Sequence, residues 1–194
     1  MSSALQTIAP PCSLEELQRY PSSVLKDEGE GAALVVRYDL PEGAVVLKTW
    51  EPRSRILGGW ARVLMRREAA HYALLDGTSG IPRFRGSYGP QAFLIEFIED
   101  AEPLKRKLGP GVIARALDDL EQVLEAVHAR RFVHLDLHQR LNIMVGRDGG
   151  VWLIDLGQGL DCSRGWARLL LRLGAWVDRR ALIKFRARYV PDTL

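Results

Sequence analysis

Two short segments in the first half of the chain have the hydrophobic pattern of β-strands. Residues 33–38 end in alternating apolar and polar positions, residues 44–48 are an apolar run that ends in Lys48, and the turn-forming segment 39–43 separates them. A period of two places every second side chain on the same face of a strand. The pattern therefore predicts a pair of strands joined by a turn. A third apolar run, residues 93–98, predicts another strand, which leads into the acidic segment 99–102.

Three other segments have the periodicity of helices. Residues 56–75 repeat apolar side chains every three to four positions, and Glu68 falls on that apolar face. Residues 112–127 show the same repeat after Gly109 and Pro110, which favour a helix start. The segment from Ser163 onward predicts two more helices, with an apolar stripe on one face and arginines four residues apart on another. The stripe consists of Trp166, Leu169, Leu170, Leu173, Trp176 and Val177, and the arginines are Arg164, Arg168 and Arg172.

A hairpin pattern lies between the last two of these helical segments. Residues 143–145 and 151–154 are short apolar runs, and residues 148–150 supply the turn. Because a hairpin folds the chain back, Asn142 and Asp155 at its two ends should face each other. An amide oxygen and a carboxylate can hold Mg²⁺ on phosphates, and the nearby Asp136 can accept the proton of a hydroxyl group. These three side chains are the ones that phosphoryl transfer to a hydroxyl requires.

The composition is that of an ordinary globular protein. Of its residues, 47% are hydrophobic and 26% are charged. A length of 194 residues is sufficient for one core or two small lobes. Cys12 and Cys162 lack metal-ligand spacing and indicate a reducing compartment. Residues 1–11 lack the basic and apolar regions of a signal peptide, and no apolar stretch approaches the ~20 residues of a membrane span. We therefore expect a cytoplasmic protein.

The order of these polar residues resembles a known family. His134, Asp136, Asn142 and the triplet Asp155-Leu156-Gly157 resemble the catalytic and metal-binding loops of the protein-kinase-like superfamily. Five residues separate Asp136 from Asn142, where the family usually has four. The extra residue could be absorbed as a bulge, or it could move Asp136 relative to the metals.

The resemblance implies an α+β fold, a minimal bilobal kinase. Its N-lobe, about residues 14–97, would be an antiparallel β-sheet with one helix. A hinge at about residues 96–102 would join it to a reduced, mainly helical C-lobe at about residues 103–194. The whole chain would then be a single kinase-like domain.

The resemblance also implies roles for residues in the N-terminal half. Lys48 would contact the ATP phosphates and pair with Glu68, although Lys48 alone could be an edge charge, and Glu68 could be a surface residue that balances nearby arginines. Gly29 and Gly31 would approach the phosphates, but Leu34 replaces the third glycine of that loop.

In the hinge, the carbonyl group of Glu96 and the amide of Ile98 would bind adenine. Asp100 or Glu102 would reach the ribose, unless they are simply solvated acidic residues. His134 would pack beneath the loop and bond to its backbone rather than move protons. His138 would be a solvated loop residue or a substrate contact.

Within the superfamily, the chain resembles the small bacterial kinases grouped with lipopolysaccharide-core (Kdo and heptose) sugar kinases and RIO-type kinases. Residues 158–194 contain no A-P-E sequence and are too few for the subdomain that docks peptides in protein kinases. The resemblance covers roughly residues 25–160. It implies ATP and Mg²⁺ or Mn²⁺ as cofactors, and as acceptor an envelope glycolipid sugar or a protein serine or threonine.

The C-terminal segment leaves two interpretations open. The net charge of the chain is +3. The segment from Ser163 onward contains eight basic residues and only two acidic ones, Asp178 and Asp192. The predicted helices could simply close the core, with solvated arginines. They could instead form a cationic surface that contacts an anionic membrane at its inner face. Nucleic acid is not an expected partner, because no base-reading motif accompanies the charge.

The sequence therefore predicts an ATP-dependent phosphotransferase. One alternative is a nucleotide-binding pseudokinase, a regulatory module in which the extra loop residue prevents transfer. The other is a structural protein that binds no nucleotide.

Overall fold

The computed structural model describes residues 12–27, 33–50 and 55–191. The predicted phosphate-contacting residues Gly29 and Gly31 lie outside these ranges, as does the segment 1–11. The chain divides into two compact units. Unit 1 comprises residues 1–76 and 82–97, and unit 2 comprises residues 77–81 and 98–194. The α+β class is confirmed, with four α-helices and a five-stranded antiparallel sheet among the described residues.

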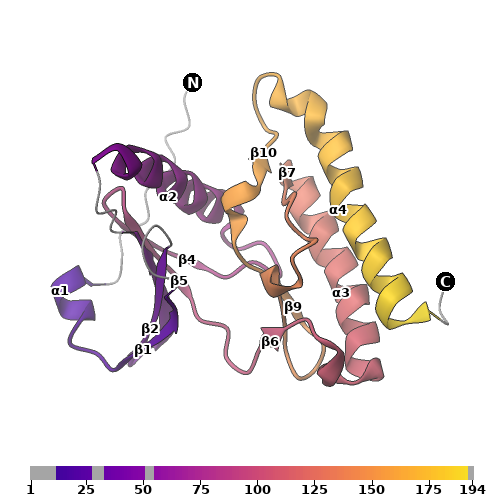
Figure 1. Cartoon of the computed structure of the whole chain (residues 1–194), viewed down its shortest axis with the longest axis horizontal. Helices are drawn as coiled ribbons and strands as arrows, with labels where there is room; N and C mark the ends of the chain where they lie inside the picture. The colour runs from indigo at the N-terminus through magenta and orange to yellow at the C-terminus, as the bar shows by residue number, and fades with distance from the viewer. Residues whose placement is uncertain (1–11, 28–32, 51–54, 192–194) are drawn as a thin grey trace. The chain divides into compact units, whose positions relative to one another are not determined.

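The five-stranded sheet forms the centre of unit 1 (Figure 1), with the strand order β1-β2-β3-β5-β4 and antiparallel pairing throughout. Its strands are β1 (Ser22–Lys26), β2 (Leu34–Leu40), β3 (Gly43–Thr49), β4 (Phe84–Tyr88) and β5 (Ala92–Glu96). The predicted pair of strands is confirmed as β2 and β3. Gly43 follows the turn with φ of 128°, a conformation that few other residues adopt.

The third predicted strand ends earlier than its apolar run. β5 stops at Glu96 instead of continuing to Ile98. The amide of Phe97 still donates to the carbonyl oxygen of Ala44 at 3.0 Å, and the division between the units follows directly after Phe97. An apolar run therefore marks a buried segment but not the residue at which its ladder of hydrogen bonds ends.

Two helices complete unit 1. The short α1 (Leu14–Leu17) begins with a capping box, in which the Ser13 hydroxyl and the Glu16 carboxylate each accept from the other's backbone amide. The longer α2 (Arg55–Leu75) packs on β4 and β5. The rings of Tyr72 and Phe93 meet there with centroids 5.6 Å apart. This packing confirms the helix that the sequence predicts over residues 56–75.

Unit 2 is built on two long helices, α3 (Pro110–Ala129) and α4 (Ala167–Tyr189), which lie side by side (Figure 1). The predicted apolar stripe of α3 is buried in full from Ile113 to Val127. A three-stranded sheet has the order β6-β8-β9, and β7 pairs with β10. The remaining elements are β6 (Glu102–Pro103), η1 (Arg106–Leu108), β7 (Phe132–Val133), η2 (Arg140–Asn142), β8 (Ile143–Val145), β9 (Val151–Leu153), η3 (Leu156–Gln158) and β10 (Leu160–Asp161).

The prediction of two C-terminal helices is wrong, because α4 is continuous for 23 residues. Gly174 lies inside it, where glycine would suggest a break. A Cβ atom at this position would lie 2.7 Å from Cγ2 of Val133, so glycine is what allows α4 to approach β7. The gain from this close packing offsets the roughly 1 kcal/mol that glycine costs inside a helix.

None of the helices in the described ranges has a stretch that is both long and apolar enough to cross a membrane.

Candidate functional site

Lys48 and Glu68 form an ion pair within unit 1. Lys48 lies near the end of β3, opposite Val35 of β2 and Phe93 of β5. Its Nζ donates to both carboxylate oxygens of Glu68 at 2.8 Å. The Glu68 side chain is only 6% exposed, so the alternative of a surface glutamate is wrong. A buried carboxylate needs such a partner, because burying it alone would be costly.

Asp136 and Asn142 lie together within unit 2, in spite of the extra residue between them. The amide nitrogen Nδ2 of Asn142 donates to Oδ2 of Asp136 at 3.0 Å and to the Asp136 carbonyl oxygen at 3.1 Å. Both residues are buried. Because Nδ2 is used in this way, Oδ1 is the atom of Asn142 that remains for a cation.

Two tight turns absorb the extra residue. The amide of Gln139 donates to the Asp136 carbonyl oxygen at 3.3 Å, and the amide of Asn142 donates to the Gln139 carbonyl oxygen at 2.9 Å. The second turn is the single turn of 3₁₀-helix η2. The loop therefore bulges between its two functional side chains while these stay in contact.

The predicted hairpin is confirmed, and its register brings its two ends together. Ile143 lies opposite Leu153, and the amide of Ile154 donates to the Asn142 carbonyl oxygen at 3.0 Å. Asp155 follows directly, in the left-handed conformation with φ of 59° and ψ of 62°. Aspartate and asparagine adopt this conformation more readily than most residues.

His134 has the structural role that the sequence indicates. It is fully buried, its Nδ1 accepts from the Asp136 amide at 3.3 Å, and its Nε2 donates to the Ile154 carbonyl oxygen at 3.1 Å. Burial lowers the pKa of His134 below its usual range, against the opposing effect of nearby carboxylates. A neutral ring with its proton on Nε2 makes both bonds at once, and so ties the loop to the end of the hairpin.

Asp178 is a site residue that the sequence analysis missed. It lies on α4, is 1% exposed, and its Oδ2 and Oδ1 accept from the amides of His134 and Leu135 at 2.9 Å and 2.8 Å. His128 of α3 lies 2.9 Å from the same carboxylate. Leu135 has φ of 64°, a strained conformation for a leucine that costs about 1–3 kcal/mol. Asp178 therefore holds the backbone that leads into Asp136.

The sequence carried no clear signal for Asp178, because it lies off the predicted apolar stripe. It lies four residues after Gly174 and four before Leu182, on the face of α4 that the structure shows to be buried. A lone carboxylate on a buried helix face requires donors, and loop amides can provide them.

Replacing Asp178 with alanine should destabilise the protein by about 3–5 kcal/mol, because two buried amides would lose their charged acceptor. Urea unfolding followed by circular dichroism would measure this. Asp118→Ala is the matched control, since Asp118 forms only an exposed ion pair with Arg186 at 3.0 Å and should cost less than about 1 kcal/mol. Equal midpoints for the two variants would contradict the role of Asp178.

His138 contacts the carboxylate of Asp136, which neither alternative for this residue anticipated. Its Nδ1 lies 3.1 Å from Oδ1 of Asp136, while its own side chain is 73% exposed. Gln139 donates to Oδ2 of Asp136 at 3.3 Å. The buried carboxylate is thus covered by one solvent-exposed ring that can move away.

A cavity of about 350 Å³ lies beside this loop in unit 2. Leu135, Leu137 and His138 line one side of it, and α4 lines the other. The basic side chains of Arg180, Lys184 and Arg188 stand at successive turns of that helix. Among the described residues, no carboxylate forms an ion pair with any of these three. The cavity therefore has an apolar floor and a cationic wall.

The residues predicted to bind adenine and ribose are placed as follows. Glu96 ends β5, and its carboxylate accepts from the Arg83 amide at 3.2 Å. Ile98 is the first residue of its segment of unit 2. Asp100 forms an exposed ion pair with Arg147 at 3.1 Å, and Glu102 pairs with Lys105. The contacts of Asp100 and Glu102 are therefore those of solvated acidic residues, as one of the two interpretations has it.

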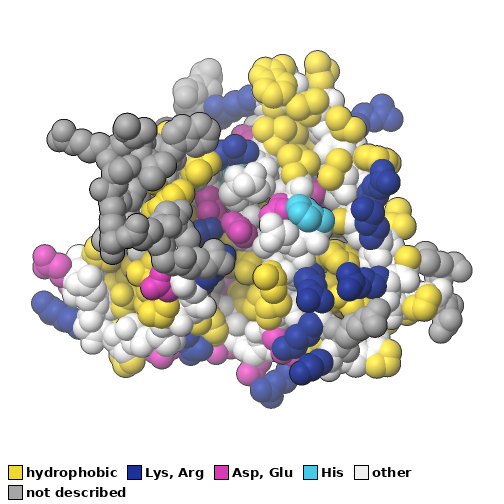
Figure 2. Space-filling view, viewed as in Figure 1, with side chains coloured by type: hydrophobic (Ala, Val, Ile, Leu, Met, Phe, Trp, Pro, Cys, Tyr) yellow, Lys and Arg dark blue, Asp and Glu magenta, His cyan; other side chains and the backbone are white. Residues whose placement is uncertain are grey.

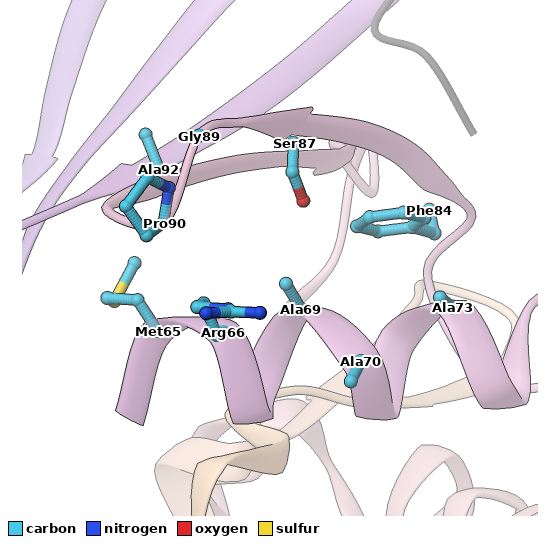
Figure 3. A pocket seen from close by; sticks show the side chains of 10 residues that line it. All are labelled: Met65, Arg66, Ala69, Ala70, Ala73, Phe84, Ser87, Gly89, Pro90 and Ala92. Carbon is cyan, nitrogen blue, oxygen red and sulfur yellow. The ribbon is translucent and has the colours of Figure 1, made fainter. Parts of the chain in front are cut away.

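A cavity of about 510 Å³ in unit 1 has none of the predicted site residues in its lining (Figure 3). It lies between α2 and the β4–β5 hairpin, with Ala69 and Ala73 pointing toward Ser87 and Phe84. Arg66 is the one charged side chain in its lining. We assign it no chemical role.

The chain matches no protein-family model and no curated protein sequence. Among the described residues there is also no cluster of three or more His, Cys, Asp or Glu side chains that would hold a metal.

Proposed function

We propose that this protein is a phosphotransferase that moves the γ-phosphate of ATP to a hydroxyl group, with the bilobal fold of the protein-kinase-like superfamily. The proposal rests above all on the contact between Asp136 and Asn142, which persists across a loop one residue longer than usual. A loop that merely resembled the motif would have no need to keep these two side chains bonded.

Asn142 and Asp155 are suited to Mg²⁺ or Mn²⁺. Magnesium usually takes one or two protein oxygens and completes its shell with water and phosphate oxygens. Oδ1 of Asn142 and the carboxylate of Asp155 are two such oxygens, at neighbouring positions on the hairpin end. A bound metal ion would neutralise charge on the phosphates.

Asp136 would act on the acceptor. Its carboxylate takes the proton as the acceptor oxygen forms its bond to the γ-phosphorus, and the bond from that phosphorus to the β–γ bridging oxygen breaks, which releases ADP. His138 must leave Oδ1 of Asp136 before the acceptor hydroxyl can reach it, and its exposure allows this.

Unit 1 would supply the remaining charge. Lys48, oriented by Glu68, would contact the phosphates, and the backbone of Glu96 and Ile98 in the hinge would bind adenine. The cavity beside the loop would take the acceptor. Its cationic wall favours an acceptor that bears negative charge, such as a phosphorylated, lipid-linked sugar, over a neutral one.

One observation favours a pseudokinase instead. His138, Gln139 and Asn142 all contact the carboxylate of Asp136, so both of its oxygens already have partners within the loop. Incubation with γ-³²P-labelled ATP, Mg²⁺ and a panel of acceptors distinguishes the two functions. The panel should include the protein itself, a neutral sugar and a phosphorylated sugar. Transfer of label supports the phosphotransferase, whereas thermal stabilisation by Mg·ATP without transfer supports the pseudokinase.

Replacing Lys48 with methionine should weaken Mg·ATP binding by about 10–100-fold, because a charged contact to phosphate is worth roughly 1.5–3 kcal/mol. The stabilisation of the protein by a fixed ATP concentration, measured by differential scanning fluorimetry, should fall accordingly. Lys107→Met, at an exposed position in η1, is the matched control and should bind as the wild type does. If Mg·ATP did not stabilise even the wild type, both nucleotide-binding functions would be contradicted. The result would then support the alternative of a structural protein that binds no nucleotide.

A further inference from the structure

Large apolar side chains face solvent along one side of α4, beginning at its N-cap residue Trp166. Trp166 is 71% exposed, Leu169 82%, Leu173 58% and Trp176 54%. We name them the α4 apolar surface. Figure 2 shows hydrophobic side chains (yellow) gathered over the first turns of α4, with Lys and Arg side chains (dark blue) beside them. Single exposed apolar residues are common, but a contiguous group of this kind marks an interaction surface.

The α4 apolar surface is not the edge of the core. Its members are spaced three, four and three residues apart, which places them along one face of the helix. The buried face of the same helix is formed by other residues, among them Ala167, Gly174 and Asp178. The interpretation that this stripe closes the core is therefore wrong for these four side chains. One face of α4 is buried, and the α4 apolar surface is a second, separate face that is exposed.

The charge around the α4 apolar surface has a single sign. Arg164, Arg168 and Arg172 are exposed, and none has an ion pair among the described residues. From Ser163 to Val177 the sequence contains no Asp or Glu at all. The guanidinium group of Arg180 lies over the ring of Trp176, with Cζ 5.1 Å from the ring centre.

We propose that the α4 apolar surface docks on an anionic lipid bilayer, with α4 lying in the plane of the membrane. Tryptophan rings are favoured at the level of the headgroups, and the leucines between them would enter the boundary with the acyl chains. Each arginine near an anionic surface adds to the attraction. This docking is independent of phosphotransfer.

Charge complementarity selects the bilayer over two other occupants. A second copy of the chain would bring the same arginines against Arg168 and Arg172, and like charges across an interface are repulsive. A nucleic acid would match the charge, and Trp166 and Trp176 offer rings for its bases, but the exposed Leu169 and Leu173 between them would stay against polar phosphates and sugars instead of being buried. An anionic membrane satisfies both the apolar stripe and the arginines.

Flotation with lipid vesicles tests the proposal. The full chain should bind vesicles of phosphatidylcholine and phosphatidylglycerol at least about tenfold more tightly than vesicles of phosphatidylcholine alone, and high salt should reduce the difference. Leu169→Ser with Leu173→Ser should lower binding to the anionic vesicles at least about tenfold. Arg168→Glu with Arg172→Glu should abolish the preference for anionic lipid. These positions are exposed, so the folded state should survive, as circular dichroism will verify.

Val63→Ser is the matched control, because Val63 is 62% exposed on α2 and lies outside the α4 apolar surface. It should bind vesicles as the wild type does. Failure of the wild type to float with anionic vesicles would overturn the proposal, as would unchanged flotation of the double leucine variant. Analytical ultracentrifugation tests a second copy as the occupant. If the wild type formed a concentration-dependent dimer that the double leucine variant lost, and neither bound vesicles, the surface would be a dimer interface and the membrane proposal would be overturned.

Discussion

Asp155→Ala should lower phosphotransfer by at least about 1000-fold, because it removes the only carboxylate in the proposed metal site and, with it, several kcal/mol of transition-state stabilisation. Alanine also fits poorly at the left-handed φ of 59° that Asp155 adopts. Asp155→Asn separates these effects. Asparagine tolerates this conformation but lacks the charge, so activity should still fall by about 100-fold or more while the unfolding midpoint stays near that of the wild type. Initial rates of label transfer from γ-³²P-ATP would measure both variants.

Asp118→Ala serves as the control for this experiment, since Asp118 is an exposed carboxylate on α3 that forms a surface ion pair with Arg186 at 3.0 Å. Its rates should equal those of the wild type. If Asp155→Asn retained full activity at limiting Mg²⁺, Asp155 would not be a metal ligand, and the proposed site would fail.

Asp136→Ala should reduce kcat by about 100- to 10,000-fold, the usual contribution of a general base. The dissociation constant for Mg·ATP should change little, because the proposal assigns Asp136 to the acceptor. This separation of kcat from nucleotide binding is what a purely structural role would not produce. Steady-state kinetics with the true acceptor, together with calorimetry of Mg·ATP binding, would resolve the two quantities.

Asp136→Ala also removes a contact of Asn142, because the Nδ2 group of Asn142 would lose one of its two hydrogen-bond acceptors. The other, the Asp136 carbonyl oxygen at 3.1 Å, belongs to the backbone and survives the substitution. Asn142 should therefore keep its orientation. Turnover at the wild-type rate in Asp136→Ala would show that this carboxylate is not the base.

Much of the local structure follows from the sequence alone, because it depends on short-range pattern. The 3.6-residue stripe of α3 predicts its buried face, and the turn at residues 148–150 predicts that β8 and β9 form a hairpin. The pairing of Lys48 with Glu68 follows from a general cost: a carboxylate on an apolar helix face must find a cation. Each of these depends on neighbours in the chain or on a rule that any fold obeys.

Other features depend on contacts between residues far apart in the chain, and only the tertiary structure decided them. Asp178 supports the loop before Asp136 from more than 40 positions away. The contact of His138 with Asp136, two residues away, is local, but it too depends on how the loop takes up its extra residue in two tight turns.

The faces of α4 show the same limit most clearly. The stripe from Trp166 to Trp176 has the periodicity of a core face, yet it is exposed, while Gly174 and Asp178 are buried. Periodicity identifies the apolar side of a helix, but which side is buried depends on shape: the close approach to Val133 requires glycine, and the loop amides require a carboxylate. The sequence by itself determined the elements and the chemistry that they carry, and the tertiary packing decided which faces they bury and which they leave for a partner.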